Sequence, residues 1–206
     1  MDESRQSPRG PAVTVADQSL ETFLSDVASS RVAPSAGAVT AVTGALAASL
    51  CEMVCLHTPT AETSPRLEAA RTELAARRGR LLELAGDDAA AVETVQTAFE
   101  ASSDEDHGQA ALGRATEAPL QIAVAARDVA EAAVVVASEG TQNARTDAVV
   151  GAYLARAAVA SAAAIVRENV ELLTDRSFVA DARARIETAE ADAEAAVTAI
   201  TDQSGN

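Results

Sequence analysis

The sequence predicts an all-α protein, a multi-helix bundle arranged around one buried, alanine-rich helix. Hydrophobic residues make up 48% of the 206 residues but aromatic residues only 2%, so the core must consist of Ala, Val and Leu. Such a core suits closely packed helices better than a sheet, where β-branched and aromatic residues dominate. Apolar residues recur at three- and four-residue steps, and no segment alternates with the period of a strand. The length indicates a single helical domain over residues 15–201, preceded by a polar, proline-containing tail, residues 1–14, that we expect to be disordered.

The central helix is predicted from the apolar run 37–56, GAVTAVTGALAASLCEMVCL. A helix that is apolar on all sides lies either in a protein core or in a membrane. The stretch without charge, 37–51, is shorter than the ~20 residues of a membrane span, which favours the core. The turn Pro34-Ser35-Ala36-Gly37 leads into this helix and leaves free backbone N–H groups that can receive an anion.

Capping residues mark the helices on either side of the central one. The first helix begins after Ser19 as N-cap and ends at 29–31. The third helix begins at Ser64-Pro65, with Ser as N-cap and Pro in the first turn. We expect Gly79 and Gly86 to loosen or interrupt this helix.

The second half of the chain predicts three more helices. An exposed acidic loop, 102–108, precedes a helix over 109–138, in which Pro119 causes a kink or a break. A further helix covers 146–173, and Asp175 caps the last one.

The charge balance excludes one class of partner. The chain has 31 acidic and 16 basic residues, a net charge of −15, and every basic residue is Arg. An acidic surplus without Lys is typical of proteins adapted to high internal salt, as in halophilic archaea. No basic stripe is present to neutralise phosphates, so nucleic acid is not expected as a partner. The first ten residues contain no apolar signal region, which predicts a cytoplasmic protein without membrane association.

Asp88 is the most informative single residue. An apolar stripe follows the third helix and carries Asp88 where the pattern calls for a core residue; its members are Leu67, Ala70, Leu74, Leu81, Ala85, Val92, Val95 and Phe99. A buried, unpaired carboxylate has a raised pKa and is a candidate general acid or base. Two alternatives stay open: pairing with an arginine of a neighbouring helix, or a stripe that breaks at Gly86.

Asp147 and Asn169 lie within about 40° of each other on one predicted helix but ~33 Å apart along it. They therefore cannot meet in one site of one chain. Asp147 also fits as first-turn charge behind a Thr146 cap, and Asn169 as an interhelical hydrogen-bond partner.

The sequence disfavours a metal site and nucleotide cofactors. Cys51 and Cys55 share a helix face, but His57 points elsewhere and His107 falls in the predicted loop, so a fourth ligand is missing. Both thiols are expected to be reduced core residues. The chain contains neither a GxGxxG fingerprint nor a P-loop. One basic cluster is expected to be solvated or to receive an anionic tail: Arg77, Arg78 and Arg80.

Five segments in order resemble the cyclodeaminase/cyclohydrolase family. This family comprises the C-terminal domain of formiminotransferase-cyclodeaminase and the stand-alone methenyltetrahydrofolate cyclohydrolases. The segments are LETFLSDVASSRVAPSAGAVTAVTGALAASLCEMVCLHT, DDAAAV, EAPLQIA, GTQNARTDAVVGA and NVELLTDRSF.

The resemblance implies an all-helical homodimer that binds a tetrahydrofolate derivative between helices near the dimer interface, with no metal or redox cofactor. The family's catalytic Asp falls on Asp88. The residues implied in substrate binding are Pro34, Gly37, Thr58, Asn143, Thr146, Asp147, Asn169 and Asp175. The leading expectation is hydrolysis of 5,10-methenyltetrahydrofolate to 10-formyltetrahydrofolate. Cyclodeamination of 5-formiminotetrahydrofolate ranks second, because no formiminotransferase domain is present to supply its substrate.

The chain departs from the family at the turn before the central helix. The family's Pro-Gly-Gly-Gly-Ser is here Pro34-Ser35-Ala36-Gly37-Ala38. This loss of glycines favours a third alternative, a non-catalytic helical dimer that binds a folate or another protein.

Overall fold

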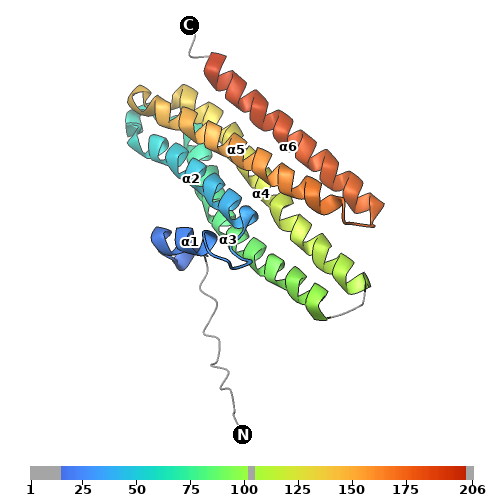
Figure 1. Cartoon of the computed structure of the whole chain (residues 1–206). Coiled ribbons are helices and arrows are strands. Elements are labelled where there is room, and N and C mark those ends of the chain that lie inside the picture. The colour runs from blue at the N-terminus through green and yellow to red at the C-terminus, as the bar shows by residue number, and fades with distance from the viewer. Residues whose placement is uncertain (1–14, 102–104, 203–206) are drawn as a thin grey trace.

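The computed structural model describes residues 15–101 and 105–202, with side chains described outside 98–105. The predicted tail, residues 1–14, lies outside this part of the chain. The predicted all-α class is confirmed, since the described residues form helices and no strand (Figure 1). The elements are η1 Val15–Asp17, α1 Leu20–Val27, α2 Ala36–His57, η2 Thr60–Glu62, α3 Pro65–Ala101, α4 Glu105–Glu139, η3 Gln142–Ala144, α5 Arg145–Val170 and α6 Arg176–Asp202.

The five long helices α2 to α6 lie side by side, and the short α1 lies near the N-terminal end of α2 (Figure 1). Short connections between long helices make sequential neighbours antiparallel, as in up-and-down bundles. α2 packs on α3, α4 and α5, whereas α6 packs on α4 and α5 at the margin of the bundle.

Small residues bring α2 close to its neighbours, as the sequence indicated. A Cβ atom added at Gly44 would lie 3.1 Å from Leu81 of α3, and one at Gly151 of α5 would lie 2.5 Å from the Cys51 sulfur. Interiors packed this tightly leave no room for an added methyl group without movement.

α2 is the expected buried central helix, but one strip of it stays exposed. Its small residues face inward, among them Ala41, Ala45 and Ala48, and larger aliphatic residues face outward. We call the exposed apolar surface of α2 and the adjoining α5 the α2–α5 strip; it consists of Val39, Leu46, Leu56, Val150 and Tyr153, which are 37–62% exposed.

Two segments have the length and composition of a membrane span: Ala36–His57 and Gln142–Val170, both with mean hydropathy 1.8. The protein itself buries 50% and 44% of their most apolar windows. Core helices of soluble proteins have these properties too, so two such helices are weak evidence for a membrane protein.

Several predicted helix boundaries were wrong. α3 continues through Gly79 and Gly86, where an added Cβ would meet nothing within 4 Å. A surface glycine costs a helix only about 1 kcal/mol, less than the burial of a single leucine such as Leu81 or Leu84 contributes. α4 begins at Glu105, inside the predicted loop, and is continuous through Pro119.

The predicted serine and aspartate caps are confirmed. The backbone N–H of Thr22 donates to Ser19 Oγ at 3.1 Å, and that of Leu67 donates to Ser64 Oγ at 3.0 Å. Asp175 Oδ1 accepts from the N–H groups of Ser177 and Phe178 at 2.9 and 3.1 Å.

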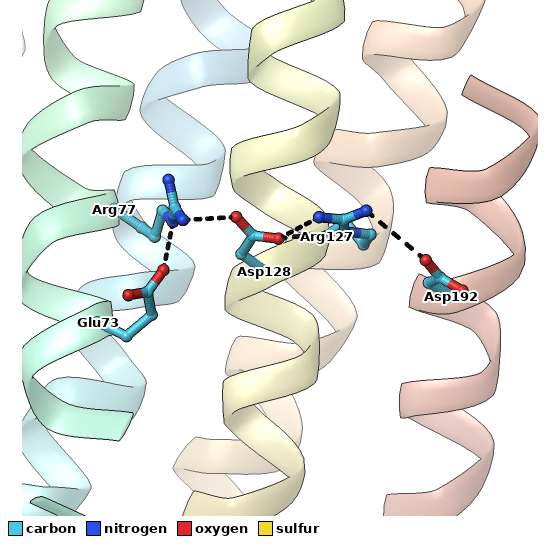
Figure 2. A network of polar contacts seen from close by, with 5 residues as sticks. All are labelled: Glu73, Arg77, Arg127, Asp128 and Asp192. Atoms are coloured by element: carbon cyan, nitrogen blue, oxygen red, sulfur yellow. Dashed lines mark hydrogen bonds and ion pairs between the residues drawn. The ribbon is translucent and has the colours of Figure 1, made fainter. Parts of the chain in front are cut away.

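A chain of ion pairs crosses three helices (Figure 2). Arg77 contacts Glu73 at 2.6 Å and Asp128 at 2.9 Å; Arg127 contacts Asp128 at 2.6 Å and Asp192 at 3.7 Å. We call these five residues the ion-pair chain; it connects α3, α4 and α6.

The predicted basic cluster is therefore not simply solvated. Arg77 belongs to the ion-pair chain, Arg78 pairs with Glu52 of α2 at 2.9 Å, and Arg80 pairs with Glu83 at 3.0 Å. The pairs of Arg77 and Arg78 join α3 to α4 and α2, the Arg80 pair lies within α3, and all three arginines are paired with carboxylates of this chain.

Candidate active site

Asp88 lies where the interrupted stripe placed it, on the buried face of α3. The residue is 4% exposed and is the only acidic residue buried to this extent among the described residues. Burial raises the pKa of its carboxyl group above the ordinary value. Asp88 forms no ion pair with any described residue, so the alternative of a paired arginine receives no support.

The turn before α2 surrounds this carboxylate. Ser35 Oγ donates a hydrogen bond to Asp88 Oδ2 at 3.2 Å. The backbone N–H of Ala38, in the first turn of α2, interacts with the same carboxylate; both donors act to lower the pKa that burial raises. The structure thus brings together two features that the sequence indicated separately, the turn and Asp88.

Gly37 leaves the space that Asp88 occupies. A Cβ atom added at Gly37 would overlap the Asp88 carboxyl group, with its carbon and both oxygens within 2.5 Å. Any side chain at position 37 must therefore displace the carboxylate from the N-terminus of α2. Gly37 thus gives the Asp88 carboxylate room to approach the start of α2. Pro34 lies in the same turn and follows a cis Ala33–Pro34 peptide bond.

The helix N-terminus suits a carboxylate electrostatically. Its free N–H groups and the positive end of the helix dipole stabilise a negative charge, while burial destabilises it. Asp88 is therefore subject to opposing influences, and none of the cationic side chains that the structure describes pairs with it to hold it ionised. This is the environment in which a carboxyl group can take up and release a proton.

Thr58 lies at the other end of α2, about 32 Å from Gly37 at 1.5 Å per residue. Its side chain is buried; Oγ1 donates to the Val54 carbonyl at 2.9 Å and accepts from the Thr141 N–H at 2.9 Å. Thr58 thereby fixes the connection between α4 and α5, which carries Asn143.

The start of α5 differs from the prediction in one detail. α5 begins at Arg145 after an Ala144 N-cap, so Thr146 is not the cap but lies in the first turn with Asp147. Thr146 and Asn143 are exposed and Asp147 is half-buried. These residues share the Thr58 end of the bundle, so one protomer does not place them beside Asp88.

A clamp at this end was not anticipated from the sequence. Ser64 Oγ donates to Glu139 Oε2, and Arg66 contacts Glu139 Oε1 at 2.9 Å. The clamp joins the start of α3 to the end of α4, next to the α4–α5 connection. Its members are far apart in the sequence, so no local pattern indicates it.

Asn169 and Asp175 occupy a third location, at the α5–α6 connection. Asn169 Nδ2 donates to the Ala115 carbonyl at 3.4 Å, which confirms the interhelical hydrogen bond. Asp175 caps α6, and its hydrogen bond from Ser177 lowers the pKa of its carboxyl group. Gln109, which sequence reasoning missed, accepts from the Thr174 N–H at 2.9 Å and holds this connection to α4.

A groove of about 360 Å³ between α3 and α4 was also missed. Its polar lining carries both signs of charge and consists of Arg80, Asp87, Thr94, Arg114, Glu117 and Gln121. Asp88 does not line it, because consecutive residues of a helix point about 100° apart.

The cysteines behave as core residues. Cys51 and Cys55 are free thiols in the interior, and burial raises the pKa of Cys51 to about 12 and that of Cys55 to about 11. Over the ranges 15–101 and 105–202, no three His, Cys, Asp or Glu residues are grouped so as to hold a metal ion.

Comparison with known proteins places this arrangement in a family. The family model for formiminotransferase-cyclodeaminase matches residues 19–188. A protein of Methylorubrum extorquens named methenyltetrahydrofolate cyclohydrolase is 32% identical over 174 residues, which is 79% of this chain and 84% of that protein. The formimidoyltransferase-cyclodeaminase of Sus scrofa is 30% identical over 94% of this chain, which spans 38% of the pig protein.

A solved structure agrees with these sequence matches. The crystal structure of formiminotetrahydrofolate cyclodeaminase from Thermotoga maritima superposes with a TM-score of 0.87 at 28% identity, covering 91% of this chain and 96% of that one. The family model, which matches residues 19–188, includes both the turn before α2 and the helix that carries Asp88. The chain therefore belongs to the formiminotransferase-cyclodeaminase family.

Proposed function

We propose that this protein hydrolyses 5,10-methenyltetrahydrofolate to 10-formyltetrahydrofolate, with Asp88 as the general base. The observation that carries the proposal is the buried carboxylate of Asp88 at the N-terminus of α2, without a cationic partner among the described residues. Membership of the family and the 32% identity to a protein named as a cyclohydrolase support this substrate class.

The hydrolysis requires few functional groups from the protein. The substrate carries its own electrophile, the cationic carbon between N5 and N10. A water oxygen bonds to this carbon while one water proton passes to Asp88. The hydroxyl group on the carbon then loses its remaining proton and becomes the formyl C=O as the bond from the carbon to N5 breaks. N5 keeps the electron pair and takes up one of the two water protons, and the formyl group remains on N10. One proton is released overall, and no metal or redox cofactor takes part.

Asp88 serves this reaction in two ways. Its ionised form favours the cationic substrate electrostatically, and its raised pKa brings proton uptake closer to neutral pH. A carboxylate held ionised by an arginine would be a weaker base.

We also propose that the protein acts as a homodimer whose site contains residues of both copies. The α2–α5 strip exposes apolar side chains on neighbouring helices, a surface of the kind that a second copy covers. A two-fold axis perpendicular to α2 would place the Thr58 end of one copy beside the Asp88 end of the other. Substrate bound at Asp88 of one protomer would then be within reach of Asn143, Thr146 and Asp147 of its partner. Asn169 and Asp175 would contribute to substrate binding from the α5–α6 connection.

The test of the reaction is the decay of methenyltetrahydrofolate absorbance with purified protein in concentrated KCl, beside Asp88→Asn. We expect rapid decay with the wild type and a loss of about 10²–10⁴-fold in kcat with Asp88→Asn. Equal rates for the two proteins would remove Asp88 from the role of base.

Cyclodeamination of 5-formiminotetrahydrofolate is the second candidate, because the matched solved structure is that of a formiminotetrahydrofolate cyclodeaminase. In this reaction N10 loses its proton and bonds to the formimino carbon, the bond from that carbon to the formimino nitrogen breaks, and the protonated nitrogen leaves as ammonia. Asp88 would act on the leaving nitrogen as an acid. Ammonia release from the formimino substrate, without decay of the methenyl compound, would select this reaction. Binding of folate without either turnover would select the non-catalytic alternative.

The dimer is tested separately by light scattering after size exclusion. We expect twice the chain mass of 21.0 kDa for the wild type. Leu46→Glu places a charge in the α2–α5 strip and should yield monomers that remain helical. A monomeric wild type with full activity would contradict the composite site.

A further inference from the structure

Ser35 occupies the N-cap of α2 but does not behave as an N-cap serine. Its backbone is extended, with φ −115° and ψ −166°, and its side chain makes no capping hydrogen bond. An N-cap oxygen ordinarily accepts from the N–H two or three residues later. Ser19 and Ser64 do so in this protein. The hydroxyl of Ser35 instead donates to Asp88, 53 residues away in the sequence.

The Asp88 carboxylate lies beside Ser35 and Gly37 at the start of α2, where the Ser35 side chain makes no capping hydrogen bond. Ala38 is the third residue of the first turn, whose N–H an N-cap side chain would bind, and this N–H interacts with the Asp88 carboxylate. One hydroxyl and one amide, both from the start of α2, thus converge on the same carboxylate. Neither donor carries a charge.

We propose that Ser35 is a positioning residue for the reaction, and that its hydroxyl orients the Asp88 carboxylate toward substrate and keeps it ionised until it takes up a proton. This inference rests on the proposed role of Asp88 as base. It assigns a specific role to Ser35, a position at which the family has a glycine.

No other group competes for this task among the described residues. Burial, the Ser35 hydroxyl and the Ala38 amide are the influences acting on Asp88, and no charged side chain is among them. The adjacent acid, Asp87, is exposed and faces Arg80 at 3.6 Å. Replacing Ser35 therefore changes the one side-chain hydrogen bond that Asp88 receives.

The experiment compares Ser35→Ala, Ser35→Thr and the matched control Ser19→Ala, which removes an N-cap serine hydroxyl without contact to Asp88. Two properties are measured: the titration of Asp88 by carbon NMR of aspartate-labelled protein, assigned with Asp88→Asn, and the pH profile of kcat/KM. The NMR titration requires no turnover, so it decides the interaction even if the protein does not hydrolyse the proposed substrate.

Ser35→Ala should raise the pKa of Asp88 by about one unit and lower kcat about tenfold, as expected on loss of a hydrogen bond to a charged group. The acid limb of the kcat/KM profile should move to higher pH in parallel. Ser35→Thr should restore both values, and Ser19→Ala should match the wild type in both. An Asp88 titration that Ser35→Ala leaves unmoved would overturn the proposal, even if kcat falls, because such a loss would mean a structural role only.

Discussion

Asp88 and Asp128 are both aspartates on long helices and both are mostly buried, but their surroundings differ in kind. Asp128 has a side chain 13% exposed and receives two guanidinium groups, those of Arg77 and Arg127. Asp88 is 4% exposed and receives a hydroxyl and an amide. The same residue type thus lies between two guanidinium groups in one place and beside uncharged donors in the other.

The difference shows how a protein with a large acidic surplus keeps one carboxylate available for chemistry. At Asp128, the carboxylate charge is balanced by the guanidinium groups of Arg77 and Arg127. Uncharged donors favour the ionised form of Asp88, and burial opposes them. Over the part of the chain that the structure describes, the absence of a cation paired with Asp88 is therefore as informative as the presence of its two donors.

The largest effect is expected from Gly37→Ala, which would fill the space that the Asp88 carboxyl group occupies. The added methyl group must displace the carboxylate, so we expect kcat to fall more than a hundredfold and the free energy of unfolding to fall by about 1–3 kcal/mol. Absorbance assays and urea unfolding measure the two quantities. Gly79→Ala is the matched control: it meets open space and should raise stability by up to about 1 kcal/mol with unchanged activity.

Asp128→Asn weakens the ion-pair chain between α3, α4 and α6. Removing this charge leaves Arg77 and Arg127 with poorer partners inside the bundle, so we expect the free energy of unfolding to fall by about 1–3 kcal/mol, with kcat within twofold of the wild type. Urea unfolding at low and high KCl provides the measurement. The exposed pair Arg156–Glu194 is the control, since Arg156→Gln should change stability by less than about 0.5 kcal/mol. A large loss of kcat in Asp128→Asn would argue against separate roles for the two regions.

The pH dependence of stability should have an unusual sign at Asp88. Because the folded state raises the pKa of this carboxyl group, the folded protein binds the proton more readily than the unfolded chain does. The contribution of Asp88 to stability is thus greatest at acidic pH and declines as pH rises toward the raised folded pKa. Asp88→Asn should remove this decline, so its stability relative to the wild type should increase between acidic and neutral pH. Urea unfolding across that range measures the difference; a relative stability that falls with rising pH would mean that the folded state prefers the ionised carboxylate.

The reactivity of the two α2 thiols, Cys51 and Cys55, tests whether the substitutions at Asp88 and Asp128 leave α2 intact, and the expected effect is the smallest of the set. Burial raises the pKa of Cys51 to about 12 and of Cys55 to about 11, so both should react slowly with a thiol reagent at pH 8 until the protein unfolds. Asp88→Asn and Asp128→Asn should retain this protection if each change stays within its own region. Rapid labelling of either variant would show that α2 had opened along its length.

Much of the fold could be predicted from the sequence because its signals are local. The Ser19, Ser64 and Asp175 caps depend on hydrogen bonds within three residues, and the apolar stripe of α3 repeats every turn. The expected interruptions at Gly79, Gly86 and Pro119 do not occur: local propensity disfavours a helix there, but packing over several turns outweighs a cost of a few kcal/mol.

The site was predictable in part for the same reason. Asp88 breaks a periodic pattern, so one sequence suffices to notice it. Its hydrogen bond to Ser35 spans 53 residues and leaves no periodic trace, and the substitution at position 35 suggested only an eroded glycine turn. The clamp of Ser64, Arg66 and Glu139 escaped detection for the same physical reason, since contacts between distant segments depend on the assembled bundle.

With Asp88 as the proposed base, its contacts with the start of α2 tie catalysis to the behaviour of a single helical turn. Helix ends open by local fluctuations that require far less free energy than global unfolding. Each time the first turn of α2 frays, the carboxylate loses the amide of Ala38 and the hydroxyl of Ser35 together. On warming, turnover should therefore cease while the bundle is still intact, so that the working temperature limit of the enzyme is set at one end of one helix and not by the melting of its core.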